Sequence, residues 1–96
     1  MTSKQRAYLR GLANNIDAIF QIGKNGINDN LIKQLNDALE ARELIKITVL
    51  ETAPDSAKDL SFEIAERTDS IVIQVICNKI TLFRQRKKDS KINLPS

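Results

Sequence analysis

The chain has no histidine and no tryptophan, and it has only one cysteine, three glycines and two prolines. Without histidine it can form neither a serine–histidine triad nor a cysteine–histidine dyad, and most zinc sites lose a common ligand. Cys77 has no partner for an internal disulfide, so we expect a reducing, cytoplasmic location. No apolar run approaches the roughly 18 residues that span a bilayer. We therefore do not expect an integral membrane protein or a membrane partner. Because Lys4, Arg6 and Arg10 interrupt the first apolar cluster, we expect no signal peptide.

The sequence also has few groups of side chains that could form a catalytic site. The pairs Asp55/Asp59 and Glu63/Glu66 have helical spacing on polar faces, where carboxylates are usually solvated. Cys77 lacks a histidine base that would activate it as a nucleophile. We therefore expect a protein that is not an enzyme and has no cofactor, no metal and no small-molecule substrate. Its 96 residues predict one domain with a small core.

Charge is distributed unevenly along the chain. Residues 1–16 carry three basic residues and no acid, residues 17–69 are acidic overall, and residues 70–96 carry six basic residues against one acid. The net charge of +3 therefore conceals two basic ends around an acidic middle. Such asymmetry favours a polyanionic partner, although solvated surface charge would give the same pattern.

Periodicity and turn residues predict seven elements. Thr2 and Gln5 have the spacing of a capping box, Asn28 is a candidate N-cap, and Cys77-Asn78 fits a tight hairpin in which Asn78 supplies the positive φ. The expected elements are a helix ending near residues 14–15, a strand at 18–22, a helix at 28–42, a strand at 43–50, a helix at 56–67, and strands at 71–76 and 79–85. This α-β-α-β-α-β-β order predicts an α/β domain over residues 1–85 with a four-stranded mixed sheet. Residues 86–96 are expected to form a basic, flexible tail.

Alternation within the strands predicts one polar and one apolar sheet face. We expect the helices to cover the apolar face and leave the other partly solvated. The polar set is Gln21, Lys46, Thr48, Gln74 and Thr81, and the apolar set is Phe20, Ile47, Ile73, Ile80 and Leu82.

One loop has the composition of a phosphate-binding turn. Its residues, Gly23-Lys24-Asn25-Gly26, lie between a predicted strand and a predicted helix. Glycines allow a tight turn and a close approach of another chain, and Lys24 adds a positive charge. A helix that begins just after the loop would offer free N–H groups to phosphate. GxxG loops of this kind grip the nucleic-acid backbone in KH domains. A plain structural turn would fit the same residues. As an RNA site, the loop is expected to lie beside the cations of the first helix.

Four separated segments together resemble the CRM domain of the YhbY type. They are residues 2–10 (TSKQRAYLR), 21–26 (QIGKNG), 38–46 (ALEARELIK) and 79–84 (KITLFR). The resemblance implies a fold similar to the C-terminal domain of translation initiation factor three, extended by an N-terminal helix. It also implies RNA binding, with stand-alone bacterial members associated with precursors of the large ribosomal subunit.

The resemblance also assigns site residues. The loop motif maps onto Gly23, Lys24, Asn25 and Gly26, and the first-helix motif onto Lys4, Gln5, Arg6 and Arg10. We expect Lys79 and Arg84 to extend this basic track. The hairpin departs from the family pattern, because Cys77-Asn78-Lys79 stands where Gly-Arg-Lys is common and Phe83 precedes Arg84 in place of tyrosine.

We expect a monomeric protein, and the resemblance implies that it contacts ribosomal RNA in assembly of the large subunit. Few groups in the sequence can read base edges, so we expect recognition to depend mainly on RNA shape and backbone. The alternative is a protein-interaction module that docks on a ribosomal or translation protein through the open face of the sheet.

Overall fold

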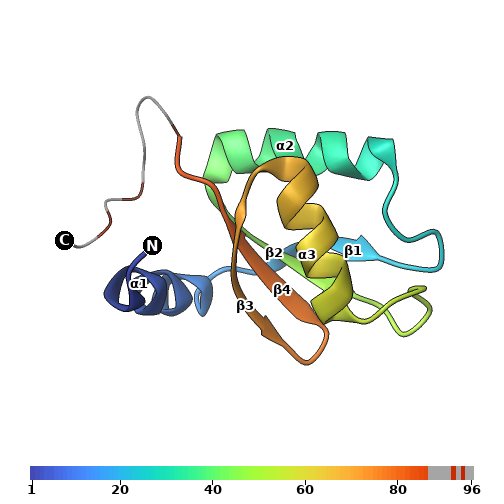
Figure 1. Ribbon diagram of the computed structural model, residues 1–96, viewed down its shortest axis with the longest axis horizontal. Coiled ribbons are helices and arrows are strands. Elements are labelled where there is room, and N and C mark those ends of the chain that lie inside the picture. Colours follow the sequence, from blue (N-terminus) through green and yellow to red (C-terminus); the bar gives the residue numbers. More distant parts are fainter. Residues whose placement is uncertain (87–91, 93, 95–96) are drawn as a thin grey trace.

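The computed structural model describes residues 1–86, 92 and 94. These residues form three helices and one four-stranded sheet (Figure 1), which confirms the predicted α/β fold and element order. The elements are α1 (Ser3–Ala13), β1 (Ala18–Ile22), α2 (Asp29–Arg42), β2 (Leu44–Val49), α3 (Ala57–Thr68), β3 (Ile71–Ile76) and β4 (Lys79–Phe83). Within the described part of the chain, no helix is long and apolar enough to cross a membrane.

The predicted helix starts are confirmed by side-chain hydrogen bonds. The Thr2 hydroxyl oxygen accepts from the Gln5 backbone N–H, and the Gln5 side chain accepts from the Thr2 N–H, both at 3.1 Å. These paired bonds form the capping box of α1. Asn28 caps α2 by accepting from the Leu31 N–H at 2.8 Å.

The strands lie in the order β1-β2-β4-β3, so β1 and β3 form the two edges. The β1–β2 pair is parallel, whereas β4 is antiparallel to both β2 and β3. Consequently, one end of the sheet holds the start of β2 and the end of β4, where Leu44 pairs with Phe83. The other end holds the end of β2 and the start of β4, where Thr48 pairs with Lys79.

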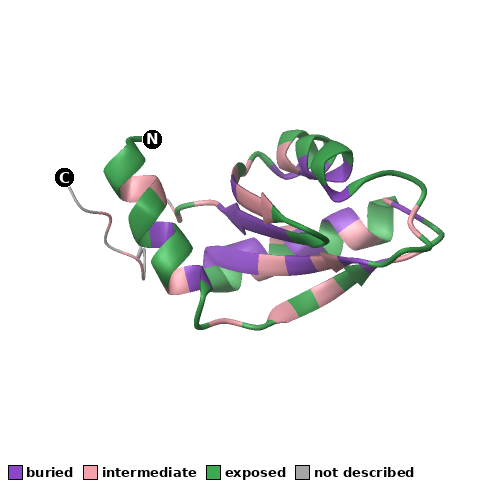
Figure 2. Ribbon diagram, turned by 90° about the horizontal axis from the view of Figure 1, so that it is seen from below, coloured by how far each residue is buried: buried purple, intermediate pink, exposed green. Residues whose placement is uncertain are grey.

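Helices α2 and α3, here called the helical layer, pack on one face of the sheet (Figures 1 and 2). Their inward residues, including Leu35, Leu39 and Ile64, are fully buried against strand residues such as Ile47 and Ile80. This apolar contact supplies the main core, since burial of aliphatic side chains is the dominant favourable term in folding.

Helix α1 packs on the opposite face, over the end of the sheet where β2 starts. Its Leu9 and Ala13 are fully buried in a second cluster with Leu44, Ile73 and Phe83. No helix of the described residues covers the rest of this face. We call it the open face, and its residues include Gln21, Lys46, Thr48, Gln74 and Lys79.

A hydrogen-bonded arginine and the C-terminal segment complete the contacts of this cluster. Arg6 Nη1 donates to the carbonyl oxygens of Val72 at 2.6 Å and Ile73 at 3.1 Å. The guanidinium group thus supplies hydrogen bonds to two backbone carbonyls of β3, an edge strand. Ile92 and Leu94 also pack against the cluster. The other tail residues, 87–91, 93, 95 and 96, lie outside the described residues, so the flexibility of the tail stays a prediction.

Two local predictions are wrong. Ile73 was assigned to the face that the helical layer covers, but the β3–β4 register shifts between Val72 and Gln74, and Ile73 joins the α1 cluster. A β-bulge of this kind turns a side chain to the other face. In the β3–β4 turn it is Cys77, not Asn78, that has the positive φ, at 53°.

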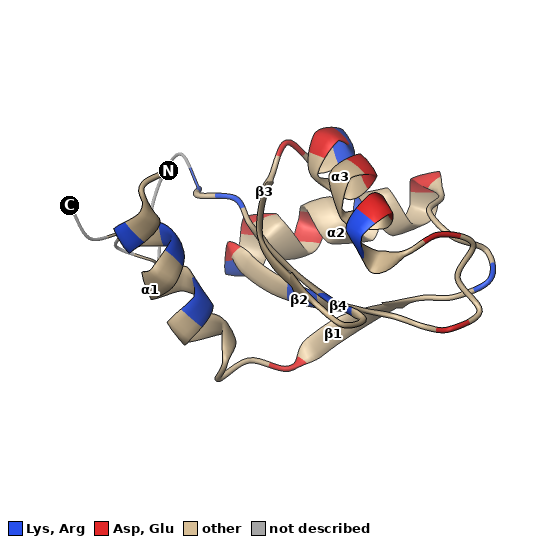
Figure 3. Cartoon of the chain, turned by 60° about the horizontal axis from the view of Figure 1, so that its bottom comes forward, with Lys and Arg blue, Asp and Glu red and all other residues tan. Residues whose placement is uncertain are grey.

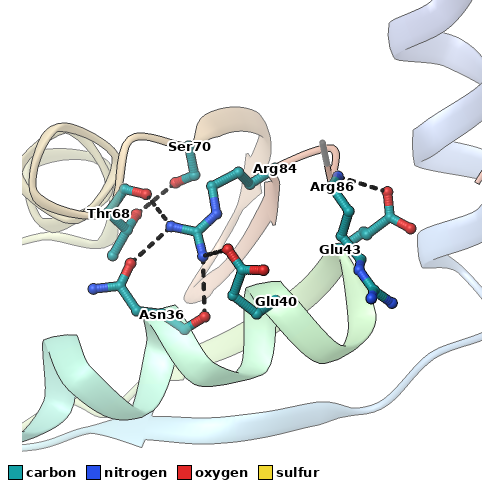
Figure 4. A network of polar contacts seen from close by, with 7 residues as sticks. All are labelled: Asn36, Glu40, Glu43, Thr68, Ser70, Arg84 and Arg86. Atoms are coloured by element: carbon teal, nitrogen blue, oxygen red, sulfur yellow. Dashed lines mark hydrogen bonds and ion pairs between the residues drawn. The ribbon is translucent and has the colours of Figure 1, made fainter. Parts of the chain in front are cut away.

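Arg84, just after β4, connects the two helices of the helical layer (Figure 4). Its Nη1 donates to Asn36 Oδ1 at 2.8 Å and to the Thr68 carbonyl oxygen at 2.7 Å. Its Nη2 donates to the Asn36 carbonyl oxygen at 3.1 Å and to Glu40 Oε1 at 3.2 Å. Only 20% of the side chain is exposed. One guanidinium therefore joins the middle of α2 to the last turn of α3.

Replacing Arg84 with methionine keeps much of the packing volume but removes these hydrogen bonds and leaves the Thr68 carbonyl without this donor. We expect Arg84→Met to lower the free energy of unfolding by about 2–3 kcal/mol, measured by urea denaturation. Arg67→Met is the matched control, because the ion pairs of Arg67 with Asp29 and Glu63 are exposed and contribute less than about 1 kcal/mol. Equal losses in the two variants would contradict the structural role of Arg84.

Candidate nucleic-acid interface

The glycine loop between β1 and α2 is a tight turn closed by its own backbone. The Gly26 N–H donates to the Gly23 carbonyl oxygen at 3.0 Å. Gly26 is buried, whereas Lys24 and Asn25 at the tip are exposed. The turn therefore presents one cation and one carboxamide to solvent.

The two glycines have different roles. Gly26 has a φ of 61°, and a Cβ added there would lie 3.0 Å from Pro54 Cγ. Both its backbone conformation and the packing of Pro54 disfavour any other residue. At Gly23 the nearest atoms, Leu50 Cδ1 and Thr52 Oγ1, would be an ordinary 3.6 Å away. Gly26 is therefore the residue that fixes the shape of the turn.

The start of α2 is less suited to an anion than the sequence predicted. The Asn28 side chain already accepts from the Leu31 N–H. Asp29 adds a carboxylate to the first turn, and its Oδ1 lies 2.8 Å from Arg67 Nη2. A negative charge at this end competes with any second anion for the helix dipole. Phosphate binding here would depend on Lys24 and the loop backbone rather than on the helix end.

A polar hollow of about 370 Å³ lies beside the loop. Residues from β1, the loop and the first turns of α2 line it, and most of them carry carboxamide side chains. They are Gln21, Gly23, Lys24, Asn25, Gly26, Asn28, Asn30, Leu31 and Gln34. Sequence reasoning missed the hollow because Gln21 and Gln34 come from different elements, and only the turn brings them together.

The predicted residues of α1 separate into two groups. Lys4 and Arg10 are exposed and face solvent. Gln5 belongs to the capping box, and Arg6 donates to the backbone of β3. Lys4 and Arg10 are therefore the residues of this motif with charges presented at the surface.

The expected contact between the loop and the α1 cations is not observed. Figures 1 and 3 show α1 at one end of the long axis and the β1–α2 loop at the other. The principal extents of the molecule are 39 × 25 × 21 Å. The prediction is wrong because α1 packs beside the start of β2, whereas the loop follows the end of the parallel strand β1.

The open face lies between these two ends. Lys79 and Lys46 project from it, since Thr48 pairs with Lys79 and alternate residues of β2 share a face. Lys79 lies at the loop end of the sheet. Lys46 was assigned to the polar face but was not predicted as a site residue. Arg84 was predicted as one, and its guanidinium is engaged by Asn36, Glu40 and Thr68.

The regular elements on the two sides of the sheet differ in their charge balance (Figure 3), and acids such as Asp17 and Glu51 lie in the loops. Helix α1 and the four strands contain Lys and Arg but no Asp or Glu. The helical layer carries an excess of acids, with two basic and three acidic residues in each helix. In the described part of the chain, no group of three or more Cys, Asp or Glu side chains could hold a metal ion.

Comparison with known proteins finds relatives that are named as RNA-binding proteins. The chain is 42% identical over 95 residues to YqeI of Bacillus subtilis, named a probable RNA-binding protein, with 99% of both chains covered. It is 27% identical to a protein of Haemophilus influenzae named RNA-binding protein, covering 99% of this chain and 95% of that one. The solution structure of SAV1595 from Staphylococcus aureus superposes with a TM-score of 0.82 at 52% identity and covers 99% of each chain.

The family model of the CRS1 / YhbY (CRM) domain matches residues 1–84. This match spans all seven elements and includes both the first-helix motif and the glycine loop. The chain therefore belongs to the CRS1/YhbY (CRM) domain family.

Proposed function

We propose that this chain binds RNA with the side of the molecule formed by α1, the open face and the glycine loop. The observation that carries the proposal is the difference in charge balance: α1 and the strands carry Lys4, Arg10, Lys46 and Lys79 with no acid, Lys24 lies at the loop tip, and each helix of the helical layer has more acids than cations. A polyanion is attracted to the first side and repelled from the second. The family and the names of the relatives support RNA as the polyanion.

In this proposal, the basic residues form a discontinuous track along the longest axis of 39 Å. Lys4 and Arg10 contact phosphates at one end, and Lys24 does so at the loop. Lys46 and Lys79 hold the backbone between them. Three other predicted residues hold helices in place instead of contacting RNA, because their hydrogen bonds lie within the protein: Gln5, Arg6 and Arg84.

The RNA that we propose is ribosomal RNA in a precursor of the large subunit, as the resemblance to YhbY-type domains implies. The protein has no catalytic part in this proposal; it contributes binding, and it acts as a monomer in the cytoplasm. A track of separated cations suits a folded RNA, whose phosphates are spread over a surface.

Reversing charge at both ends of the track tests the proposed surface. We expect the double variant Lys24→Glu/Arg10→Glu to bind fragments of large-subunit ribosomal RNA at least about tenfold more weakly, measured by fluorescence anisotropy at several salt concentrations. The salt slope of log K should also become shallower by about 0.7 for each lost contact with a single strand. Circular dichroism should remain native, because both side chains are exposed.

The matched control is Lys33→Glu/Lys58→Glu, which changes net charge equally but lies on the helical layer. We expect it to retain most of the affinity. Equal weakening in both double variants would show a general charge effect and contradict the assigned side. Equal affinity of the wild-type protein for small-subunit fragments would contradict the large-subunit assignment but not RNA binding.

The glycine turn gives a second test. Gly26→Ala introduces a Cβ at positive φ and 3.0 Å from Pro54 Cγ, so we expect a loss of about 1–2 kcal/mol in unfolding free energy and weaker RNA binding. Gly23→Ala is the control, since its Cβ would make only ordinary contacts. Wild-type RNA affinity in a folded Gly26→Ala protein would show that the shape of the turn does not matter for binding.

A further inference from the structure

The hollow beside the glycine loop has an unusual composition for a phosphate site. Lys24 is the only cationic residue among those that line it, whereas five of them carry carboxamides: Gln21, Asn25, Asn28, Asn30 and Gln34. Sites that hold phosphate normally present arginine, lysine or several backbone N–H groups. The carboxylate of Asp29 at the start of α2 further disfavours an anion. The chemistry of the hollow therefore indicates a neutral polar group.

The carboxamide side chains remain available for a ligand. Asn28 uses its Oδ1 to cap α2, which leaves its NH₂ group. Within residues 1–86, no hydrogen bond occupies the side chains of Gln21, Asn25, Asn30 or Gln34. All four residues are exposed to solvent. Asn30 and Gln34 are four residues apart on α2 and project on the same side of that helix.

A carboxamide offers a donor and an acceptor side by side, which matches the edge of a nucleobase. Asparagine and glutamine bind adenine in this bidentate way. We propose that the hollow binds one unpaired nucleobase, with adenine the best match, while Lys24 holds a neighbouring phosphate. This inference rests on the proposed RNA binding, and it adds a base-reading site to a surface otherwise built for backbone contacts.

The size and position of the hollow fit this ligand. The hollow has a volume of about 370 Å³ and is open to solvent, so a base can enter it from a single-stranded chain. Leu31 adds an apolar contact for a base. The base must be unpaired, because side chains cannot read the deep, narrow major groove of A-form RNA and base pairing occupies the Watson–Crick edges. A single-stranded loop or bulge is therefore the expected RNA element.

The test compares base-bearing RNA with RNA that lacks bases. The probes are labelled decamers of adenosine, cytidine and uridine, together with an abasic ribose-phosphate decamer that keeps every phosphate. We expect the wild-type protein to prefer the adenosine decamer. Asn30→Ala/Gln34→Ala should bind that decamer about 5- to 150-fold more weakly, bind the abasic decamer as the wild type does, and keep the salt slope.

The double variant should fold, because alanine is a better helix former than either residue and both side chains are exposed. Gln85→Ala is the matched control: it also removes an exposed carboxamide, but it follows β4 at the end of the sheet away from the hollow, and we expect wild-type binding.

Three outcomes would overturn the inference. If the double variant binds all decamers as the wild type does, the hollow reads no base, and RNA binding itself stands. If it loses affinity for the abasic decamer equally, the two residues contact the backbone. If the wild-type protein binds neither these probes nor ribosomal RNA fragments, the proposed function fails and the inference fails with it.

Discussion

The packing of α2 and α3 on one face of the sheet is the constraint on which the rest of this structure depends. Burial of residues such as Leu35, Leu39 and Ile64 fixes which face each strand presents to the core. A one-residue change of register would turn the lysines of β2 and β4 inward. The acids on the outer surfaces of these helices are thereby kept away from Lys46 and Lys79. Hydrophobic packing thus produces the difference in charge balance on which RNA binding is proposed to depend.

The same packing explains why several arginines serve the fold. Two helices lie side by side on one face, and Arg84 joins the middle of α2 at Asn36 to the end of α3 at Thr68. Helix α1 lies alone on the opposite face, where Arg6 ties it to the backbone of β3. Guanidinium groups suit these positions because several donors can reach carbonyl oxygens from one side chain.

Much of the fold follows from local signals in the sequence. The capping box of Thr2 and Gln5 and the cap at Asn28 depend on residues three apart, and these predictions are confirmed. The bulge at Ile73 and the positive φ of Glu43, 66°, do not follow from local pattern. They arise from tertiary demands: Ile73 fills the α1 cluster, and Glu43 forms the abrupt junction between α2 and β2.

The candidate site was predictable in its parts but not in its arrangement. The glycine loop and the α1 cations are visible as motifs, yet nothing in their spacing shows that they lie at opposite ends of the molecule. The sequence marks Lys46 only as a polar strand residue. Its position on the open face between those two ends follows from the order and pairing of the strands. The carboxamides of the hollow were missed for the same reason, since Gln21 and Gln34 meet only after folding.

The most direct test of the central claim is a nuclear magnetic resonance titration of the labelled protein with a large-subunit ribosomal RNA fragment. The account predicts that backbone amide shifts change at Arg10, Lys24, Lys46 and Lys79, with the outer residues of α3 unaffected. Changes confined to α3 and the outer surface of α2 would place the RNA on the acidic side and contradict the account.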